Sequence, residues 1–85
     1  MDIIYSPTFA RGYKKLSKEV ALAAEKKEKI FRNNPFDSRL RTHKLHGELK
    51  EFWSFSINED YRVIFEFTSR QIVWFHFVGK HDIYK

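Results

Sequence analysis

Three aromatic-rich segments in the C-terminal half constrain the fold more than any other feature of the chain. They are FWSFSI (residues 52–57), YRVIFEF (61–67) and IVWFHFVG (72–79), and only NED and TSRQ connect them. Aromatic and β-branched residues that alternate with polar ones are typical of strands, and connections this short join antiparallel neighbours. The pattern therefore predicts a three-stranded antiparallel meander.

Successive side chains of a strand point to opposite faces of the sheet, so pairing Ile57 with Tyr61 across the first turn assigns each residue to a face. One face receives the large apolar side chains, which are Trp53, Phe55, Ile57, Tyr61, Val63, Phe65 and Phe67. The other face receives Ser54, Ser56, Arg62 and Glu66. We expect the first face to form the core and Arg62 to project from the second. Two registers of the last strand stay open, and they place His76 either beside Arg62 or against Val63.

The N-terminal half predicts a short strand and two helices. DIIY at residues 2–5 is the strand candidate. Ser6 followed by Pro7 is a helix start, and Ser17 opens a second helix. Pro35 ends that helix because it lacks a backbone donor. The apolar stripe of the second helix consists of Val20, Ala23, Ala24, Ile30 and Phe31.

Residues 36–51 show no clean period and are predicted to form an exposed connection. Together these elements predict an α+β fold, in which two N-terminal helices pack on one face of a twisted, mainly antiparallel four-stranded sheet. At 85 residues, we expect one domain that spans residues 1–85.

Composition narrows the function classes. The chain has no cysteine, so we expect neither a disulfide framework nor thiolate chemistry. No apolar run is long enough to span a bilayer, and the N-terminus lacks the order of a signal peptide, which favours the cytoplasm and no membrane partner. The formal net charge of +5, with its basic excess between Arg11 and Lys50, favours a polyanion or an acidic protein as partner. For most of the lysines at positions 14, 15, 18, 26, 27 and 29, a solvated helix surface is the better explanation.

The order of the elements resembles the RelE/ParE superfamily of toxins from type II toxin-antitoxin systems. The resemblance rests on KLHGELKEFWSFSINEDYRVIFEF at residues 44–67 and FVGKHDIY at 77–84, and it covers essentially the whole chain. Its most specific parts are the Leu-x-Gly motif, the DYRVIF segment and the terminal VGKH. It implies a RelE-like fold and an antitoxin that holds the toxin inactive. Most members cleave messenger RNA in the ribosomal A site, whereas the ParE branch inhibits DNA gyrase.

The histidines favour RNA cleavage and the YafQ/YoeB-like branch. Cleavage without a metal needs a base for the 2′-hydroxyl proton, an acid for the leaving 5′-oxygen and a cation for the phosphorane. Imidazole exchanges protons near neutral pH and suits both proton roles. The resemblance implies that His43 and His81 carry the proton transfers, with the base and acid roles still interchangeable. It also implies that Arg62 binds the phosphate and that Tyr84 is the aromatic residue behind the terminal histidine.

Basic residues around these positions are candidate RNA contacts, namely Arg39, Arg41, Lys44, His46, Lys50 and Lys80. Such contacts position RNA without reading its sequence. Alternation along the strands assigns Trp74 and Phe52 to the second face, where they could stack a base or be covered by the antitoxin. RelE itself carries lysines in the first strand of the meander, where this chain has Trp53 and Phe55. Cleavage would therefore depend on histidines.

We expect no metal and no cofactor, because the histidines show no close ligand spacing with carboxylates. The predicted function is a ribosome-dependent mRNA endoribonuclease of a type II toxin-antitoxin system. Its predicted partners are messenger RNA, the A site of the ribosome and a cognate antitoxin. The alternative is a non-catalytic, ParE-like toxin that inhibits DNA gyrase by binding.

Overall fold

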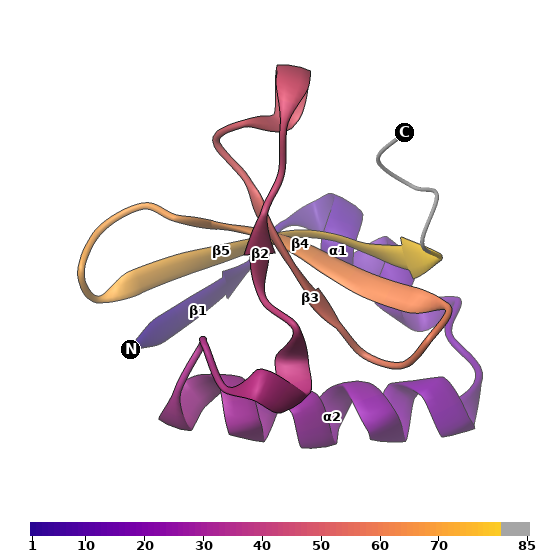
Figure 1. The fold of residues 1–85 in the computed structure, drawn as a ribbon. Helices are drawn as coiled ribbons and strands as arrows, with labels where there is room; N and C mark the ends of the chain where they lie inside the picture. The colour runs from indigo at the N-terminus through magenta and orange to yellow at the C-terminus, as the bar shows by residue number, and fades with distance from the viewer. Residues whose placement is uncertain (81–85) are drawn as a thin grey trace.

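The computed structural model describes residues 1–80 of the chain. Its single sheet has five strands in the order β1 (Asp2–Tyr5), β5 (Ile72–Lys80), β4 (Tyr61–Phe67), β3 (Trp53–Ser56) and β2 (His43–Lys44). Two helices, α1 (Pro7–Lys14) and α2 (Lys18–Asn33), follow β1. Figure 1 shows α2 along one side of the sheet and the short 3₁₀ turn η2 (Gly47–Leu49) on the other side.

The α+β class, the two helices and the meander are as predicted, but the sheet has five strands and not four. Strands β3, β4 and β5 form the antiparallel meander, β2 pairs antiparallel with β3, and β1 pairs parallel with β5. The missing strand was β2. A strand of two residues has no period, so the hydrophobic pattern could not reveal it.

The core lies between the helices and the face that alternation assigned to it. Phe55, Ile57, Val63 and Phe65 are buried there, and Trp53, Tyr61 and Phe67 pack around them. Phe31 of α2 is the centre of an aromatic cluster, with ring centroids 5.0–5.4 Å from those of Phe65, Phe55 and Phe75. In so short a chain these rings supply a large share of the apolar area that folding buries.

The helix boundaries follow the predicted signals. The Ser6 hydroxyl accepts from the N–H of Phe9 at 2.9 Å, and Pro7 occupies the first turn of α1. Ser17 caps α2 in the same way through the N–H of Val20. Gly12 lets α1 approach β5 closely, because a Cβ there would lie 2.8 Å from the carbonyl oxygen of Val78. None of the helices in residues 1–80 is long and apolar enough to cross a membrane.

The prediction of an exposed connection over residues 36–51 was wrong in part. The segment holds the 3₁₀ turn η1 (Ser38–Leu40), strand β2 and the turn η2. Leu40 is fully buried in the main core, and Leu45 is 6% exposed. Two leucines separated by polar residues anchor the segment without giving it a repeating pattern, which is why periodicity did not identify it.

A β-bulge in β5 resolves the open register. Ile64 pairs with Phe77 while Phe65 pairs with Phe75, so His76 is the extra residue. Arg62 pairs with Gly79 and Val63 with Val78, and neither alternative position for His76 is therefore the observed one. A bulge leaves its extra residue without a ladder partner and increases the local twist of the strand.

Candidate functional site

The candidate site lies on the face of the sheet opposite the helices, hereafter the helix-free face. Its residues form rows that run across the strands, and each row consists of residues paired between neighbouring strands. Partners across an antiparallel ladder share a face. Arg62 of β4 stands in a row with Ser56 and Gly79. His43 of β2 stands in the next row, with Ser54, Ile64 and Phe77. His43, one of the two predicted proton carriers, and Arg62, the predicted phosphate ligand, thus share one face.

His43 is exposed, and its ring is held in a defined tautomer. Its Nδ1 lies 3.0 Å from the carbonyl oxygen of Arg41. A carbonyl oxygen only accepts, so Nδ1 carries the hydrogen and donates it. In the neutral ring Nε2 then keeps its lone pair and is the atom that can accept a proton. Arg41 has φ 53°, a left-handed conformation that is uncommon outside glycine, and it directs this carbonyl toward the ring.

The guanidinium of Arg62 is anchored by the turn between β3 and β4. Its Nη1 donates to the carbonyl oxygens of Asn58 at 2.7 Å, Tyr61 at 3.2 Å and Glu59 at 3.3 Å. These contacts use one nitrogen of the fork. The edge formed by Nε and Nη2 is the geometry that binds two oxygens of a phosphate at once. The turn therefore orients the arginine before any substrate is bound.

The strand register gives the backbone separation of His43 and Arg62. They lie two strands apart and two positions apart along the strands, which corresponds to a Cα separation of about 12 Å. Both side chains leave the same face, and the hydrogen bonds of the Arg62 guanidinium place it toward the β3–β4 turn, on the side away from the row of His43. The other two predicted catalytic residues, His81 and Tyr84, lie outside the described residues. In the sequence His81 follows Lys80, which pairs with Tyr61 beside Arg62.

The predicted RNA contacts fall into two groups. Arg39 and Arg41 line a small pocket beside the β3–β4 turn. His46 and Lys50 flank η2 and are exposed, as is Lys80 at the end of β5. Lys44 pairs with Trp53, whose side chain faces the core, so Lys44 lies on the opposite side of β2 from His43. The structure does not bring Lys44 to the helix-free face.

The sequence did not assign a pair of titratable residues that the bulge creates on the helix-free face. His76 Nε2 lies 3.0 Å from Glu66 Oε1. The imidazole stacks on Trp74 at 5.9 Å and meets the edge of Phe52 at 5.0 Å. The alternation of side chains correctly predicted that Trp74 and Phe52 lie on the helix-free face. The pairing with Glu66 depends on the bulge, for which the sequence carries no signal.

One buried polar atom lies in the row of His43. The Ser54 side chain is fully buried, and its Oγ has no hydrogen-bond partner among the described residues. An unsatisfied hydroxyl costs about 1–3 kcal/mol when it is buried.

Within residues 1–80, no three His, Asp or Glu side chains gather as metal ligands.

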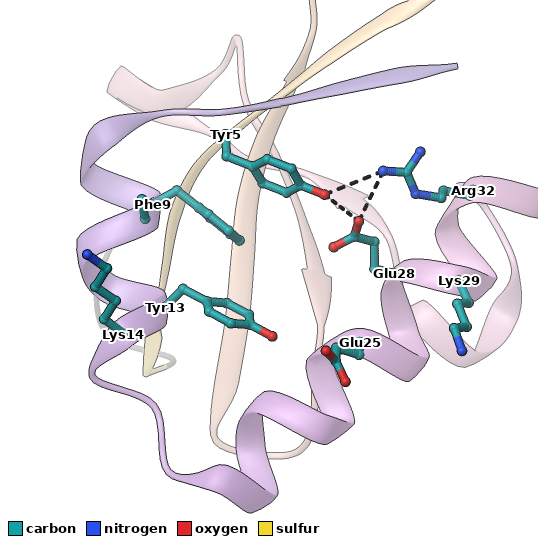
Figure 2. A pocket seen from close by; sticks show the side chains of 9 residues that line it. Tyr5, Phe9, Tyr13, Lys14, Glu25, Glu28, Lys29 and Arg32 are labelled. Carbon is teal, nitrogen blue, oxygen red and sulfur yellow. Dashed lines mark hydrogen bonds and ion pairs between the residues drawn. The ribbon is translucent and has the colours of Figure 1, made fainter.

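On the helix side, a groove of about 810 Å³ runs between α1 and α2 next to β1. Figure 2 shows its aromatic wall of Tyr5, Phe9 and Tyr13 and its charged rim. Tyr5 donates to Glu28 at 2.5 Å, and Arg32 donates to the same carboxylate at 3.2 Å. Burial, and then the hydrogen bond to Glu28, raise the pKa of Tyr5. The phenol therefore stays protonated as a donor that ties β1 to α2.

Solved structures similar to this chain include bacterial proteins whose names identify them as toxins. YafQ from E. coli strain BL21(DE3) has a TM-score of 0.79 at 20% identity, over 94% of this chain and 92% of its own. A YoeB/ParE toxin from Agrobacterium tumefaciens has a TM-score of 0.80 at 15% identity, over 95% and 99%. The E. coli DinJ-YafQ toxin-antitoxin complex has a TM-score of 0.76 at 20% identity, over 94% and 91%. At these identities the likeness establishes the fold.

No curated protein matches the sequence. The family model described as the RelE-like toxin of type II toxin-antitoxin system HigB matches residues 10–81, which is most of the chain and includes both rows of the candidate site. The chain therefore belongs to the HigB-like family of RelE-like toxins of type II toxin-antitoxin systems.

Proposed function

We propose that this toxin is a ribosome-dependent mRNA endoribonuclease that works without a metal. The observation that carries the proposal is that His43 and Arg62 both lie on the helix-free face. Among the described residues, His43 has a ring nitrogen without a hydrogen-bond partner that can accept a proton, and Arg62 has a guanidinium edge without a partner that can bind phosphate. A toxin that acts by contact alone has no need of that pair.

In the proposed reaction, a ribose 2′-oxygen attacks the adjacent phosphorus and the bond from phosphorus to the 5′-oxygen breaks. His43 Nε2 takes the proton of the 2′-hydroxyl. Arg62 binds two equatorial oxygens of the phosphorane, and its charge does not change during the reaction. The leaving 5′-oxygen takes a proton from the general acid, for which His81 remains our candidate. Tyr84 also remains a candidate catalytic residue. The products are a 2′,3′-cyclic phosphate and a 5′-hydroxyl.

The test is single-turnover cleavage of a message in the A site of purified ribosomes, followed by primer extension and by analysis of the new ends. We expect cuts that require the ribosome, with cyclic phosphate and 5′-hydroxyl termini. Uncut message together with a loss of gyrase supercoiling activity would support the ParE-like alternative and overturn the proposal. Ends that carry a 5′-phosphate would exclude this mechanism even if the message is cut.

We also propose a cognate antitoxin as partner, supported by the family assignment and by a solved DinJ-YafQ complex of the same fold. The outer edge of β1 is unpaired in the described sheet, and the groove beside it has an aromatic wall and a rim that includes Lys14 and Lys29. The groove is also lined by Arg32, Glu25 and Glu28, so its cations outnumber its carboxylates by three to two. A segment that is both apolar and acidic fits this surface, and an extended chain can add to the strand edge. Reversing Lys14 and Lys29 to Glu should weaken co-purification with the product of the neighbouring gene. The matched control reverses Lys18 and Lys26, which do not line the groove.

A further inference from the structure

Beside the β3–β4 turn, a pocket of about 200 Å³ opens where the β2 ladder stops. It is lined by Lys27, Arg39, Arg41, Ser56, Asn58 and Glu59, and we call it the edge notch. We propose that the edge notch binds a second phosphate of the RNA, one that is not cleaved. The inference rests on the proposed function for the identity of its substrate, but the notch can be tested without cleavage.

The backbone explains why the notch exists. Strand β2 pairs with β3 only at Lys44–Trp53 and His43–Ser54. Two more pairs of the same ladder would set Thr42 against Phe55 and Arg41 against Ser56, but the left-handed conformation of Arg41 turns the chain away. The outer edge of β3 at Ser56 is therefore left without a strand beside it.

The same edge supplies a backbone donor. The N–H of Ile57 donates to Tyr61 O at 2.9 Å across the turn, so it points toward β4. Backbone N–H groups alternate in direction along a strand, and the N–H of Ser56 accordingly points to the other side, toward the notch. An N–H beside a hydroxyl and cationic side chains suits a phosphate oxygen.

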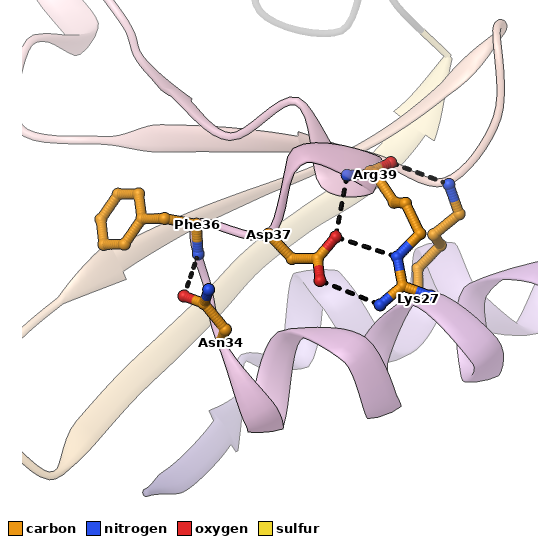
Figure 3. Close-up of polar contacts among 5 residues, drawn as sticks. All are labelled: Lys27, Asn34, Phe36, Asp37 and Arg39. Atoms are coloured by element: carbon orange, nitrogen blue, oxygen red, sulfur yellow. Dashed lines mark hydrogen bonds and ion pairs between the residues drawn. The ribbon is translucent and has the colours of Figure 1, made fainter.

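The three cations of the notch differ in what already binds them. Arg39 forms a two-pronged pair with Asp37, with both contacts at 2.9 Å, and Lys27 donates to the carbonyl oxygen of Arg39 at 3.1 Å (Figure 3). Lys27 uses one of its three donors in this way. Arg41 is exposed, and its side chain makes no hydrogen bond or ion pair with another described residue. Arg41 is thus the main candidate for the phosphate, with Lys27 second.

The notch also borders the candidate active site. Asn58 and Glu59 line it, and their carbonyl oxygens hold the guanidinium of Arg62. Ser56 is the ladder partner of Arg62. A phosphate in the notch would therefore belong to a nucleotide close to the one cut at Arg62. Glu59 lines the same pocket, and its negative charge opposes the binding of phosphate.

Because the notch holds both cations and a carboxylate, removal of a positive charge should weaken RNA binding and removal of the negative charge should strengthen it. The probe is a fluorescent, fully 2′-O-methylated single-stranded RNA, which cannot be cleaved by 2′-hydroxyl attack, titrated with the toxin between about 50 and 200 mM salt. Arg41→Gln should weaken binding about two- to fivefold and lower the salt slope by about 0.7. Arg41→Lys should restore binding, because the charge is kept. Glu59→Gln should tighten it.

Two further variants separate charge from structure. Arg41→Gly keeps the left-handed backbone and loses the cation, so it should bind RNA as weakly as Arg41→Gln. Arg70→Gln makes the same change of charge in the turn at the opposite end of β4 and serves as the control. Equal effects at Arg41 and Arg70, or no tightening in Glu59→Gln, would overturn the edge notch. If these binding effects appear but ribosomal cleavage does not, the notch stands and the proposed nuclease falls.

Discussion

Substitutions of His43 separate its proposed catalytic role from a structural one. In Asn the amide nitrogen lies where Nδ1 lies in histidine, so His43→Asn can still donate to the carbonyl oxygen of Arg41. It has no atom at the position of Nε2. In Gln the amide reaches the Nε2 position instead, but an amide is not a base near neutral pH. The Asn variant thus keeps the donor at the Nδ1 position, and the Gln variant keeps a polar atom at the Nε2 position.

The magnitudes of the two roles are far apart. Loss of a general base lowers the rate typically 10²- to 10⁴-fold, which is about 2.7–5.4 kcal/mol in the barrier. Loss of the single hydrogen bond to Arg41 costs about 0.5–1.5 kcal/mol of stability, and His43 is exposed, so the lower end applies. We therefore expect both variants to lose cleavage by at least about a hundredfold, while only His43→Gln melts at a lower temperature.

The assay is single-turnover cleavage on ribosomes across a pH series, with thermal unfolding of each variant followed by circular dichroism. The wild-type toxin should cleave at least about a hundredfold faster than either variant at every pH of the series. If His43→Asn cleaves at the wild-type rate while His43→Gln loses activity in step with its stability, His43 only holds the β2 segment in place. The reasoning from the tautomer would then be refuted.

Three further predictions test the neighbourhood of the site and the core. Arg62→Lys should lose cleavage by about 10²-fold, measured in the same ribosomal assay with thermal unfolding recorded alongside, because one ammonium cannot replace the paired donors. Gly12→Ala should lower the melting temperature by about 4–8 °C, since its Cβ would lie 2.8 Å from Val78 O. Asp37 has its pKa lowered to about 2 by its hydrogen bonds to Arg39. It should stabilise the fold above pH 4 and lose that effect as pH falls through about 2, so urea unfolding of wild type and Asp37→Asn should converge there.

The strand faces could be predicted because the meander alternates in two clear classes. Trp53 and Phe55 differ so plainly from Ser54 and Ser56 that only one assignment buries the aromatic residues. The same logic placed Arg62 on the helix-free face. Alternation gives a face but not a side-chain conformation, so the anchoring of Arg62 by the carbonyl oxygens of the turn could not be predicted.

The features that the sequence did not reveal share a physical cause. Strand β2 forms through its pairing with β3. The bulge at His76 forms because Phe65 pairs with Phe75 while Ile64 pairs with Phe77. These are long-range pairings, whereas periodicity reports only local order. The tautomer of His43 likewise depends on a left-handed Arg41, a conformation for which glycine or asparagine would have been the usual signal.

Asn58 should act on cleavage through Arg62. Its Oδ1 accepts from the N–H groups of Asp60 at 2.9 Å and Tyr61 at 2.8 Å, which closes the β3–β4 turn. Its own carbonyl oxygen receives the shortest contact of the Arg62 guanidinium. If the turn holds the arginine in its binding orientation, loosening the turn should slow the chemical step even though Asn58 does not touch the reacting atoms.

We therefore expect a graded series at Asn58. Serine makes the same kind of turn more weakly and alanine cannot make it, so single-turnover rates should fall in the order Asn, Ser, Ala. The Ala variant should lose about tenfold in rate, because the fork of Arg62 is then held less well. Asn58 also lines the edge notch, and the rate at saturating toxin distinguishes the two roles. A defect that disappears at saturation would mean weaker binding in the notch, whereas one that persists at saturation reflects the orientation of Arg62.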